Sequence, residues 1–327
     1  MPSVNTVNVV SAIPAEVWER EKPPGLELNF LHTLVPVEAD WHVVYGLRTQ
    51  LKIPNRPGHI LFVASEPPEI RRYNLAVLAR YRVVLGPGFD YVKNLDNYRF
   101  TSGIAPWWVG VTSPTATHYR GIDGSLELDR AALSRLQAPA AEKISVIVSD
   151  KARTPLQAQR LRLVEYLSAK ISDLEVFGVG HNPIGDKAAA LAVSRYHLAV
   201  ENSLHPGYWT EKLADPILMG CAVFYGGHPS YSNDLPGGGV TVIDPFDPES
   251  AYRTIGESLS AGYWAGSAEG IMRNKASLLS TRSFHRVIEK EVMGLSSSGP
   301  KRTQTRMPAH HPEARWKKLV DPLYKRL

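Results

Sequence analysis

Polar side chains follow one predicted strand, and a lysine comes nine residues later. The strand covers residues 196–200 and ends in Glu201-Asn202-Ser203. In an open parallel sheet, ligands bind outside the carboxyl ends of the strands. Lys212 starts a predicted helix, and the free amide groups at a helix start favour an anion. The combination predicts a site for a diphosphate.

A simpler interpretation of the same residues stays open. Glu211 and Lys212 are also ordinary residues for the first turn of a helix with one face in solvent. Pro216 leaves the extent of this helix undecided, because an interior proline costs about 3 kcal/mol unless it lies in the first turn.

Several common catalytic signatures are missing from the sequence. Gly178-Val179-Gly180 follows a predicted strand, but the next glycine is Gly185, so the spacing indicates a tight turn and not a dinucleotide fingerprint. The sequence contains no Walker A loop, no Gly-x-Ser-x-Gly elbow, no His-Glu-x-x-His and no Asp-x-Asp pair. Its single cysteine, Cys221, excludes an internal disulfide and a cysteine-rich zinc site. The motifs give no support to a metal site.

Short apolar runs predict a parallel sheet in the first half of the chain. Residues 42–45, 59–63 and 82–85 are β-branched or aromatic and are bounded by turn residues, as buried strands are. A helical stretch over 69–80 separates the last two and predicts a right-handed β-α-β crossover. Residues 1–40 lack a clear period, and we interpret them as an irregular lead-in followed by short strands.

The second half of the chain repeats the alternation. Residues 112–142 are polar and rich in Ala and Pro, as in a linker that carries one short helix. The strands that we then expect are 144–148, 174–177, 196–200, 222–225 and 240–243. Thr154-Pro155-Leu156-Gln157 predicts a capped helix that runs to about Ala169. Further helices are expected around Lys187, near 211–220 and over 248–293.

These elements predict an α/β protein with two Rossmann-like domains and a cleft between them. Residues 1–140 form the first expected domain, 141–295 the second, and 296–327 a basic tail. At 327 residues with 43% apolar and 21% charged residues, the chain fits two soluble domains of about 150 residues each. We predict an intracellular protein, because the sequence shows neither a run of about 18 apolar residues nor the order of a signal peptide.

The positive charge of the chain is concentrated at its end. The formal net charge is +5, but residues 296–327 hold eight Lys and Arg against two Asp and Glu, so the remainder is close to neutral. One alternative is therefore a basic nucleic-acid-binding protein whose α/β body is a scaffold. Residues 314–327 mix aromatic, aliphatic and basic side chains, which suits contact with a membrane surface. Pro322 interrupts any continuous helix there, so a solvated tail is an equal alternative.

Six ordered segments closely resemble the α-1,3/4-fucosyltransferases of glycosyltransferase family ten. They are FGVG (177–180), Lys187, RYHLAVENS (195–203), GYWTEKLADPILMG (207–220), FYGG (224–227) and VIDPFD (242–247). The resemblance covers about residues 144–250 well, and the segment FVASEPP (62–68) is similar to the turn after a strand of the family's first domain. It implies a GT-B architecture and metal-independent, inverting transfer, classically from GDP-fucose to a glycan, without a cofactor.

The resemblance also implies roles for individual residues. Glu66 matches the proposed general base, and its alternative is a loop carboxylate that caps the following helix. Arg160 matches a phosphate-binding arginine, with Arg162 as the competitor in a shifted register. Arg160 and Lys212 would stabilise the departing diphosphate. The other donor-side residues implied are Lys187, Asn202, Tyr208 and Glu211, and also Glu201, which orients Lys212 or Arg160 in the alternative interpretation.

Departures from the family pattern concern the sugar and the acceptor. Trp209 replaces a valine beside the expected sugar site, so another nucleotide sugar is the main alternative donor. Trp107 and Trp108 are candidates for an acceptor platform, because indole rings stack on sugars, and buried packing is the equal alternative. We expect a nucleotide-sugar donor, a glycan acceptor and no nucleic acid. The expected location is the cytoplasm, with peripheral contact on the inner face of the cell membrane through 314–327.

Overall fold

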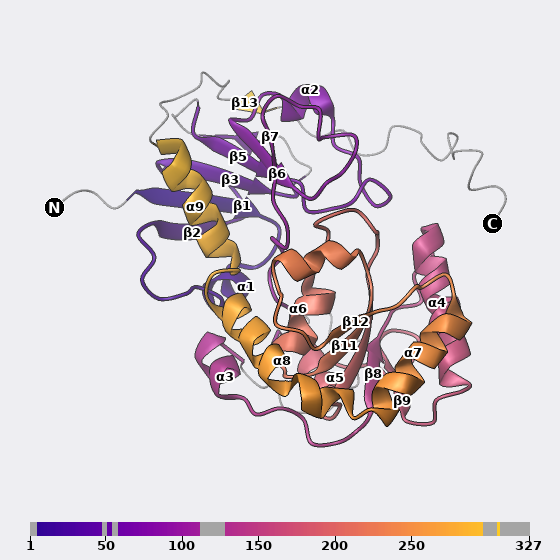
Figure 1. Ribbon diagram of the computed structural model, residues 1–327. Helices are drawn as coiled ribbons and strands as arrows, with labels where there is room; N and C mark the ends of the chain where they lie inside the picture. Colours follow the sequence, from indigo (N-terminus) through magenta and orange to yellow (C-terminus); the bar gives the residue numbers. More distant parts are fainter. Residues whose placement is uncertain (1–4, 48–50, 54–57, 112–127, 297–305, 308–327) are drawn as a thin grey trace. The chain divides into compact units, whose positions relative to one another are not determined.

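The computed structural model of the 327-residue chain describes residues 5–47, 51–53, 58–111, 128–296 and 306–307 (Figure 1). Contacts divide the chain into two compact units. Unit 1 consists of Met1–Glu19, Pro24–Thr101 and Val287–Leu327, and unit 2 of Arg20–Pro23 and Ser102–Arg286. Each unit contains its own parallel sheet, and each is described by itself.

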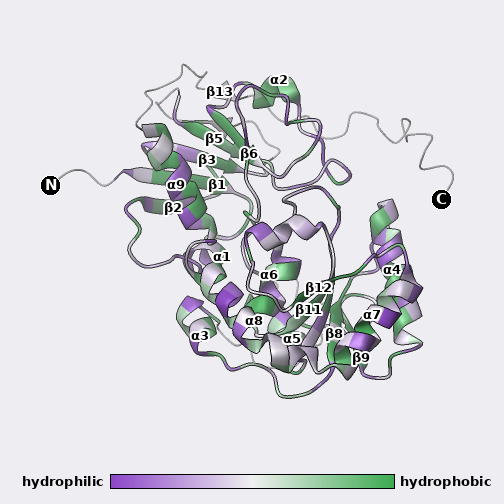
Figure 2. Ribbon diagram, viewed as in Figure 1, coloured by the Kyte–Doolittle hydropathy of each residue, from purple (hydrophilic) through white to green (hydrophobic). Residues whose placement is uncertain are grey.

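Unit 1 is built on a six-stranded parallel sheet in the order β2-β1-β3-β5-β6-β7. Its strands are β1 (Thr6–Ser11), β2 (Asn29–Thr33), β3 (Trp41–Tyr45), β5 (Ile60–Val63), β6 (Val83–Gly86) and β7 (Tyr98–Phe100). Two short helices, α1 (Ala15–Glu19) and α2 (Leu75–Leu78), lie between the strands in sequence, and α9 (Phe284–Ser296) joins this unit from Val287. A short antiparallel pair, β4 (Leu51–Lys52) with β13 (Arg306–Met307), completes it. The apolar character of β5 and β6 is visible in Figure 2.

Two predictions for unit 1 are wrong in detail. β1 is a buried inner strand between β2 and β3, not an irregular lead-in. Asn8 interrupts its apolar residues and is fully buried. The Asn8 side chain donates to Thr33 Oγ1 at 2.8 Å, which satisfies this buried amide. The helix expected over 69–80 is only α2, since the carbonyl of Pro67 closes a turn with the amide of Arg71 and Asn74 then caps the helix.

Unit 2 contains a five-stranded parallel sheet in the order β12-β11-β10-β8-β9. The strands are β8 (Ile144–Ile147), β9 (Leu174–Phe177), β10 (Tyr196–Val200), β11 (Ala222–Gly226) and β12 (Val240–Val242). The helices are α3 (Arg130–Arg135), α4 (Pro155–Ser168), α5 (Lys187–Leu191), α6 (Glu211–Leu218), α7 (Pro248–Ser260) and α8 (Tyr263–Leu279), with a 3-10 helix at Pro229–Asn233. All five predicted strands are confirmed, and each end lies within one residue of the prediction.

The predicted start of α4 is also confirmed. Thr154 is the N-cap and its hydroxyl accepts the amide of Gln157 at 3.1 Å, with Pro155 at the first helical position. The Gln157 side chain reaches back to the amide of Arg153, one residue before the expected partner. These local bonds satisfy amides that a helix start leaves open.

Both faces of the unit 2 sheet are covered, as alternating side chains of β11 show. Val223 and Tyr225 pack in one apolar cluster with residues of α5 and α6, and Phe224 packs in a second cluster with residues of α4 and α7. A parallel sheet buried on both faces explains why its strands are continuous apolar runs. Unit 2 therefore has helices on both sides of its sheet.

The observed division of the chain differs from the predicted boundary at residue 140. Trp107, Val109, Leu128 and Leu133 pack in the cluster that contains α6, so these residues belong to unit 2. The surrounding sequence is polar enough to suggest a linker, and the four apolar side chains that anchor it are widely spaced. At the other end, the chain joins unit 1 from Val287 onward, within the range expected for the second domain.

Candidate functional site

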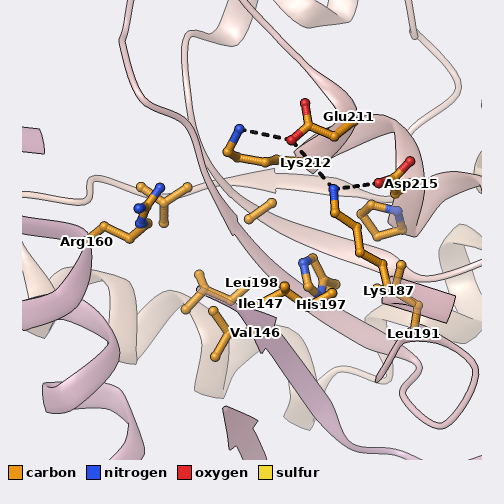
Figure 3. Close-up of a pocket in the computed structure, with 13 residues that line it drawn as sticks. Val146, Ile147, Arg160, Lys187, Leu191, His197, Leu198, Glu211, Lys212 and Asp215 are labelled. Atoms are coloured by element: carbon orange, nitrogen blue, oxygen red, sulfur yellow. Dashed lines mark hydrogen bonds and ion pairs between the residues drawn. The ribbon is translucent and has the colours of Figure 1, made fainter. Parts of the chain in front are cut away.

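A pocket in unit 2 lies at the sheet and is lined by residues of β8, α4, α5, β10 and α6 (Figure 3). Its charged and polar members are Arg160, Lys187, His197, Glu211, Lys212 and Asp215. The rest of the lining is apolar: Val146, Ile147, Leu191, Leu198, Ala199, Val200 and Pro216. Three cationic side chains thus line one pocket whose other walls are largely apolar, and water screens charges there less than at the surface.

Arg160 enters the pocket from α4. The buried residues of this helix recur at the spacing of one helix face, and Arg160 is the charged residue in that stripe, with 7% of its surface exposed. Its Nη1 donates to Asn202 Oδ1 at 3.2 Å, and its buried Nε lacks a partner among the described residues. Burial lowers the pKa of Arg160, while Glu201, Tyr208 and Glu211 oppose that shift. Arg162 is exposed and bonds Gln159, so the geometry places Arg160 in the pocket and Arg162 outside it.

Glu201 fixes the start of α6. It follows β10, is fully buried, and accepts hydrogen bonds from the amide of Thr210 at 2.8 Å and from its hydroxyl at 2.9 and 3.1 Å. Thr210 is in turn the N-cap of α6, and its hydroxyl oxygen accepts a hydrogen bond from the amide of Lys212. Burial raises the pKa of Glu201, and Lys212 opposes the shift. These bonds place Glu201 between the N-cap of α6 and Lys212, and both sequence-based roles for it, donor binding and orientation of Lys212, stay predictions.

Glu211 and Lys212 form an ion pair at the first turn of α6. Lys212 Nζ lies 3.2 Å from Glu211 Oε1 and 3.7 Å from Glu201 Oε2. Burial alone would lower the pKa of Lys212, but Glu211 and Glu201 outweigh it and raise the pKa. Burial alone would raise the pKa of Glu211, but Lys212 and Lys187 lower it to about 2. Both groups are charged at neutral pH, and their side chains are about a quarter or less exposed.

Lys187 is held by two carboxylates of α6. Its Nζ lies 2.7 Å from Asp215 Oδ2 and 3.5 Å from Glu211 Oε1 (Figure 3). Burial opposes the charged form, but Asp215 and Glu211 together raise the pKa of Lys187. Sequence reasoning missed Asp215, which is 1% exposed. The available signal was its spacing: Asp215 lies four residues after Glu211, on the same face of the helix.

His197 is a second residue that sequence reasoning missed. It is the second residue of β10, lines the pocket and is 4% exposed. Its Nδ1 is 2.9 Å from the Ser145 hydroxyl. Burial, with Lys187 adding to it, lowers the pKa of His197 to about 3, so the ring is neutral at pH 7. A histidine inside an apolar strand gave no signal that it faces a ligand pocket.

Tyr208, which was expected on the donor side, and its neighbour Trp209 are not among the residues that line the pocket. Tyr208 is 3% exposed and lies in the segment that leads into α6. Trp209 is also buried; its indole Nε1 donates to Asp234 at 2.8 Å. The indole covers Gly103, where φ is +61° and a Cβ would lie 1.9 Å from a ring atom, so only glycine fits. Trp209 therefore packs in the core of unit 2 and is not part of the pocket lining.

Trp107 and Trp108 differ in exposure. Trp107 is 2% exposed and packs in the apolar cluster of unit 2, so the packing alternative describes it, because no face of its ring is open to stack on a sugar. Trp108 is half-buried. The amide of Trp107 donates to Glu21 and that of Trp108 to Asp215 at 3.0 Å.

Glu66 belongs to unit 1, in the loop after β5. The residue is half-buried, and its amide donates to the Tyr73 hydroxyl at 3.2 Å. Burial raises the pKa of that hydroxyl, and Arg71 opposes the shift. The next helix, α2, is capped by Asn74, so the alternative in which Glu66 caps this helix is wrong.

The pocket suits an anionic ligand with hydroxyl groups. Arg160, Lys187 and Lys212 supply cationic donors, and Arg160 offers a buried Nε without a partner among the described residues. Glu211, ionised at neutral pH, can accept hydrogen bonds from hydroxyls. The predicted membrane contact through 314–327 lies outside the described residues. Within the described ranges, the helices are too short or too polar to span a bilayer.

Known proteins of similar sequence are fucosyltransferases. The 3-galactosyl-N-acetylglucosaminide 4-alpha-L-fucosyltransferase of Pan troglodytes is 36% identical over 231 residues, which are 66% of this chain and 53% of that protein. The human 4-galactosyl-N-acetylglucosaminide 3-alpha-L-fucosyltransferase is 24% identical over 230 residues, with the same shares. The chain therefore spans about half the length of the curated relatives it matches. A scan against family models finds no match.

Solved structures of similar fold are glycosyltransferases. Anabaena HepE, solved with UDP-glucose, covers 90% of this chain with a TM-score of 0.50 and 12% identity, and all of HepE is covered. Sucrose-phosphate synthase of Thermosynechococcus elongatus gives a TM-score of 0.52 at 10% identity, with 90% and 100% covered. The predicted GT-B fold class and the predicted resemblance to fucosyltransferases are confirmed.

Proposed function

We propose that this chain, which is fucosyltransferase-like in sequence and GT-B in fold, transfers fucose from GDP-fucose to a glycan hydroxyl. Transfer inverts the anomeric carbon and needs no metal ion. Two named fucosyltransferases among the relatives support fucose as the sugar, and they make the nucleic-acid-binding alternative the weaker one.

The observation that carries this proposal is the pocket of unit 2, which is lined by Arg160, Lys187 and Lys212. A nucleoside diphosphate leaves with growing negative charge on its phosphate oxygens. Fixed cations that face this charge stabilise the transition state more than the ground state. Arg160 and Lys212 stabilise the diphosphate, and Glu211, Asn202 and Tyr208 bind hydroxyl groups of the donor.

The reaction is a single displacement. The acceptor hydroxyl gives its proton to the carboxylate of Glu66 while its oxygen forms a bond to the anomeric carbon of the sugar. The bond between that carbon and the phosphate oxygen breaks, and the electron pair leaves with the nucleoside diphosphate. General-base catalysis of this kind contributes about 10²–10⁴-fold.

A panel of nucleotide sugars tests the donor and the reaction together. The purified chain is incubated with GDP-fucose, GDP-mannose, UDP-glucose and dTDP-rhamnose and a mixture of glycan acceptors, with and without EDTA. We expect GDP and a product heavier by one deoxyhexose from GDP-fucose alone, at equal rates with EDTA. Release of UDP or dTDP instead would replace the donor, and loss of activity in EDTA would contradict the metal-independent step.

We also propose that the enzyme works in the cytoplasm at the inner face of the cell membrane, through residues 314–327. The support is sequence alone: this segment places Lys and Arg among Trp316, Leu323 and Tyr324. Each basic residue near an anionic surface contributes about 1 kcal/mol. The full chain should sediment with anionic liposomes and a chain ending at Ser296 should not. Equal sedimentation of both would contradict the idea.

A further inference from the structure

The segment Trp107–Gly110 is held by side chains, not by a helix or a strand. Three amides donate to carboxylates: Trp107 to Glu21, Trp108 to Asp215 at 3.0 Å, and Gly110 to Asp186 at 2.9 Å. Arg20 donates to the carbonyls of Trp107 and Val109 at 2.6 and 2.5 Å. Since buried backbone groups need partners, these acids and Arg20 define the path of the segment.

Of the three acids, Asp215 also contacts the pocket lysine Lys187. Asp186 precedes it and caps α5. Asp215 uses its two oxygens differently: Oδ1 accepts the amide of Trp108, and Oδ2 lies 2.7 Å from Lys187 Nζ. Asp215 thus joins the Trp107–Gly110 segment to a cation of the pocket.

This double contact makes the position of the ammonium group definite. The Asp215 carboxylate is almost fully buried on α6, and turning it would break its bond to the main chain of Trp108. A lysine has a long flexible side chain, so a fixed acceptor decides where its charge lies. The alternative partner of Lys187 is Glu211 at 3.5 Å, which already pairs with Lys212 at 3.2 Å.

We propose that Asp215 is a positioning residue for the transfer reaction: it holds the Lys187 ammonium at the wall of the pocket, where that ammonium meets the donor diphosphate. The inference rests on the proposed function of this pocket. It assigns Asp215 an effect that acts through Lys187 and not through contact with the substrate.

Asp215→Asn is the informative change. The carboxamide keeps the shape and an oxygen for the Trp108 amide, but its NH₂ group faces the Lys187 ammonium, and neither can accept a hydrogen bond. Lys187 then turns to Glu211 and weakens the pairing of Glu211 with Lys212. We expect kcat to fall about tenfold or more, because misplaced charges cost transition-state stabilisation. GDP affinity stays equal or rises, since the pocket loses one negative charge.

A double-mutant cycle tests whether Asp215 acts through Lys187. We compare kcat at saturating GDP-fucose for the wild type, Asp215→Asn, Lys187→Met and the double variant. The loss from Asp215→Asn should shrink to less than about twofold in the Lys187→Met background, as expected for coupled residues. An equal fold-loss in both backgrounds would overturn the proposal.

Glu21→Gln is the matched control. Glu21 is another buried carboxylate that accepts the neighbouring amide of the same segment, and it is not part of the pocket lining. We expect this variant to lose thermal stability and to keep kcat within about twofold. If Glu21→Gln lowers kcat as much as Asp215→Asn does, the effect is one of segment structure and the proposal fails.

The failure of this inference can be told from failure of the proposed function. A wild-type chain that neither binds GDP in calorimetry nor transfers fucose refutes the proposed function. A wild type that does both, with an additive cycle, refutes only the role of Asp215. If Asp215→Asn does not fold, the cycle is repeated with Asp215→Glu, which keeps the charge and displaces the carboxylate oxygens. We then expect kcat to fall in the chain that retains Lys187 and to change little in the Lys187→Met background.

Discussion

The carboxylates that follow β10 in unit 2 and β5 in unit 1 are held in different ways. Glu201 is fully buried, and its oxygens accept both polar groups of Thr210 and face Lys212 at 3.7 Å. Glu66 is half-buried, and the Tyr73 hydroxyl holds its main-chain amide. The described bonds thus hold Glu201 by its carboxylate and Glu66 by its main-chain amide. A carboxylate proposed to take a proton has to keep its side chain within reach of a substrate.

The surroundings of the two carboxylates differ in charge as well. In unit 2, Glu201, Glu211 and Asp215 alternate with Lys212 and Lys187 over distances of 2.7–3.7 Å. Such an ordered set is prepared for an anion before it binds, which saves reorganisation at the moment of reaction. In the proposed function, donor binding belongs to unit 2 and proton transfer to Glu66 of unit 1, so changes in each unit should affect one and spare the other.

Glu66→Gln should have the largest effect. The amide cannot accept the acceptor's proton, so we expect kcat to fall about 10²–10⁴-fold while GDP binding is unchanged. Transfer is measured with GDP-fucose, and binding by calorimetry. Glu69→Gln, a half-buried glutamate three residues on, should keep kcat within about twofold. Near-normal turnover of Glu66→Gln would show that Glu66 is not the general base, and the proposed division of roles between the two units would fail with it.

Arg160→Gln tests the proposed donor site in unit 2. Loss of a buried guanidinium that faces the diphosphate should lower kcat about 10²-fold and weaken GDP binding at the same time. Arg162→Gln, on the same helix but exposed, is the control and should change neither beyond about twofold. The variants are compared by initial rates and calorimetry. Equal effects of both would mean that the pocket is not the donor site.

Much of unit 2 could be predicted because its signals are local. Apolar runs bounded by turn residues identified its strands, and Thr154-Pro155 with Gln157 identified the start of α4. The Trp107–Gly110 segment could not be predicted, since its backbone is held by acids 76 to 107 residues away in sequence. Its place in unit 2 depends on tertiary contacts that no local pattern reports.

The site residues also fall into those that local sequence signals identified and those that they did not. Glu201, Glu211 and Lys212 stand close together in sequence around one strand end and one helix start, so their spacing predicted that they lie together, and the distances of 3.2 and 3.7 Å from Lys212 Nζ to Glu211 and Glu201 agree. Asp215 and His197 were missed. Asp215 lies in a helix whose course Pro216 left undecided, and the helix in fact continues through this proline to Leu218. His197 sits in an apolar strand, where its neutral ring is bound to Ser145.

Acid should weaken unit 2 through Glu211. Its pKa of about 2 lies below the usual 4.5, so the folded state prefers the carboxylate; this stabilisation is complete above pH 4.5 and is lost as pH falls toward 2. The free energy of unfolding should therefore differ between wild type and Glu211→Gln by about 1–3 kcal/mol at pH 6, and less at pH 3. Urea titrations at several pH values measure this.

A surface pair supplies the control for that experiment. Glu175 pairs with Lys143, and both side chains are a third or more exposed. Glu175→Gln should change the free energy of unfolding much less than Glu211→Gln does, because solvent screens an exposed pair. If the difference in the free energy of unfolding between wild type and Glu211→Gln does not shrink on acidification, the pocket lysines do not lower the pKa of Glu211. The charged groups of the pocket would then be less ordered than we describe.

Tyr73→Phe should have the smallest effect and tests how unit 1 positions its carboxylate. The change removes the hydroxyl oxygen that accepts the Glu66 amide and leaves the ring packed on Phe62. One hydrogen bond is worth about 1 kcal/mol, so kcat should fall about fivefold without a change in GDP binding. Tyr81→Phe alters another tyrosine that packs on Phe62 and should leave kcat unchanged. A larger loss in Tyr73→Phe than in Glu66→Gln would mean that the loop, and not its carboxylate, is what the reaction needs.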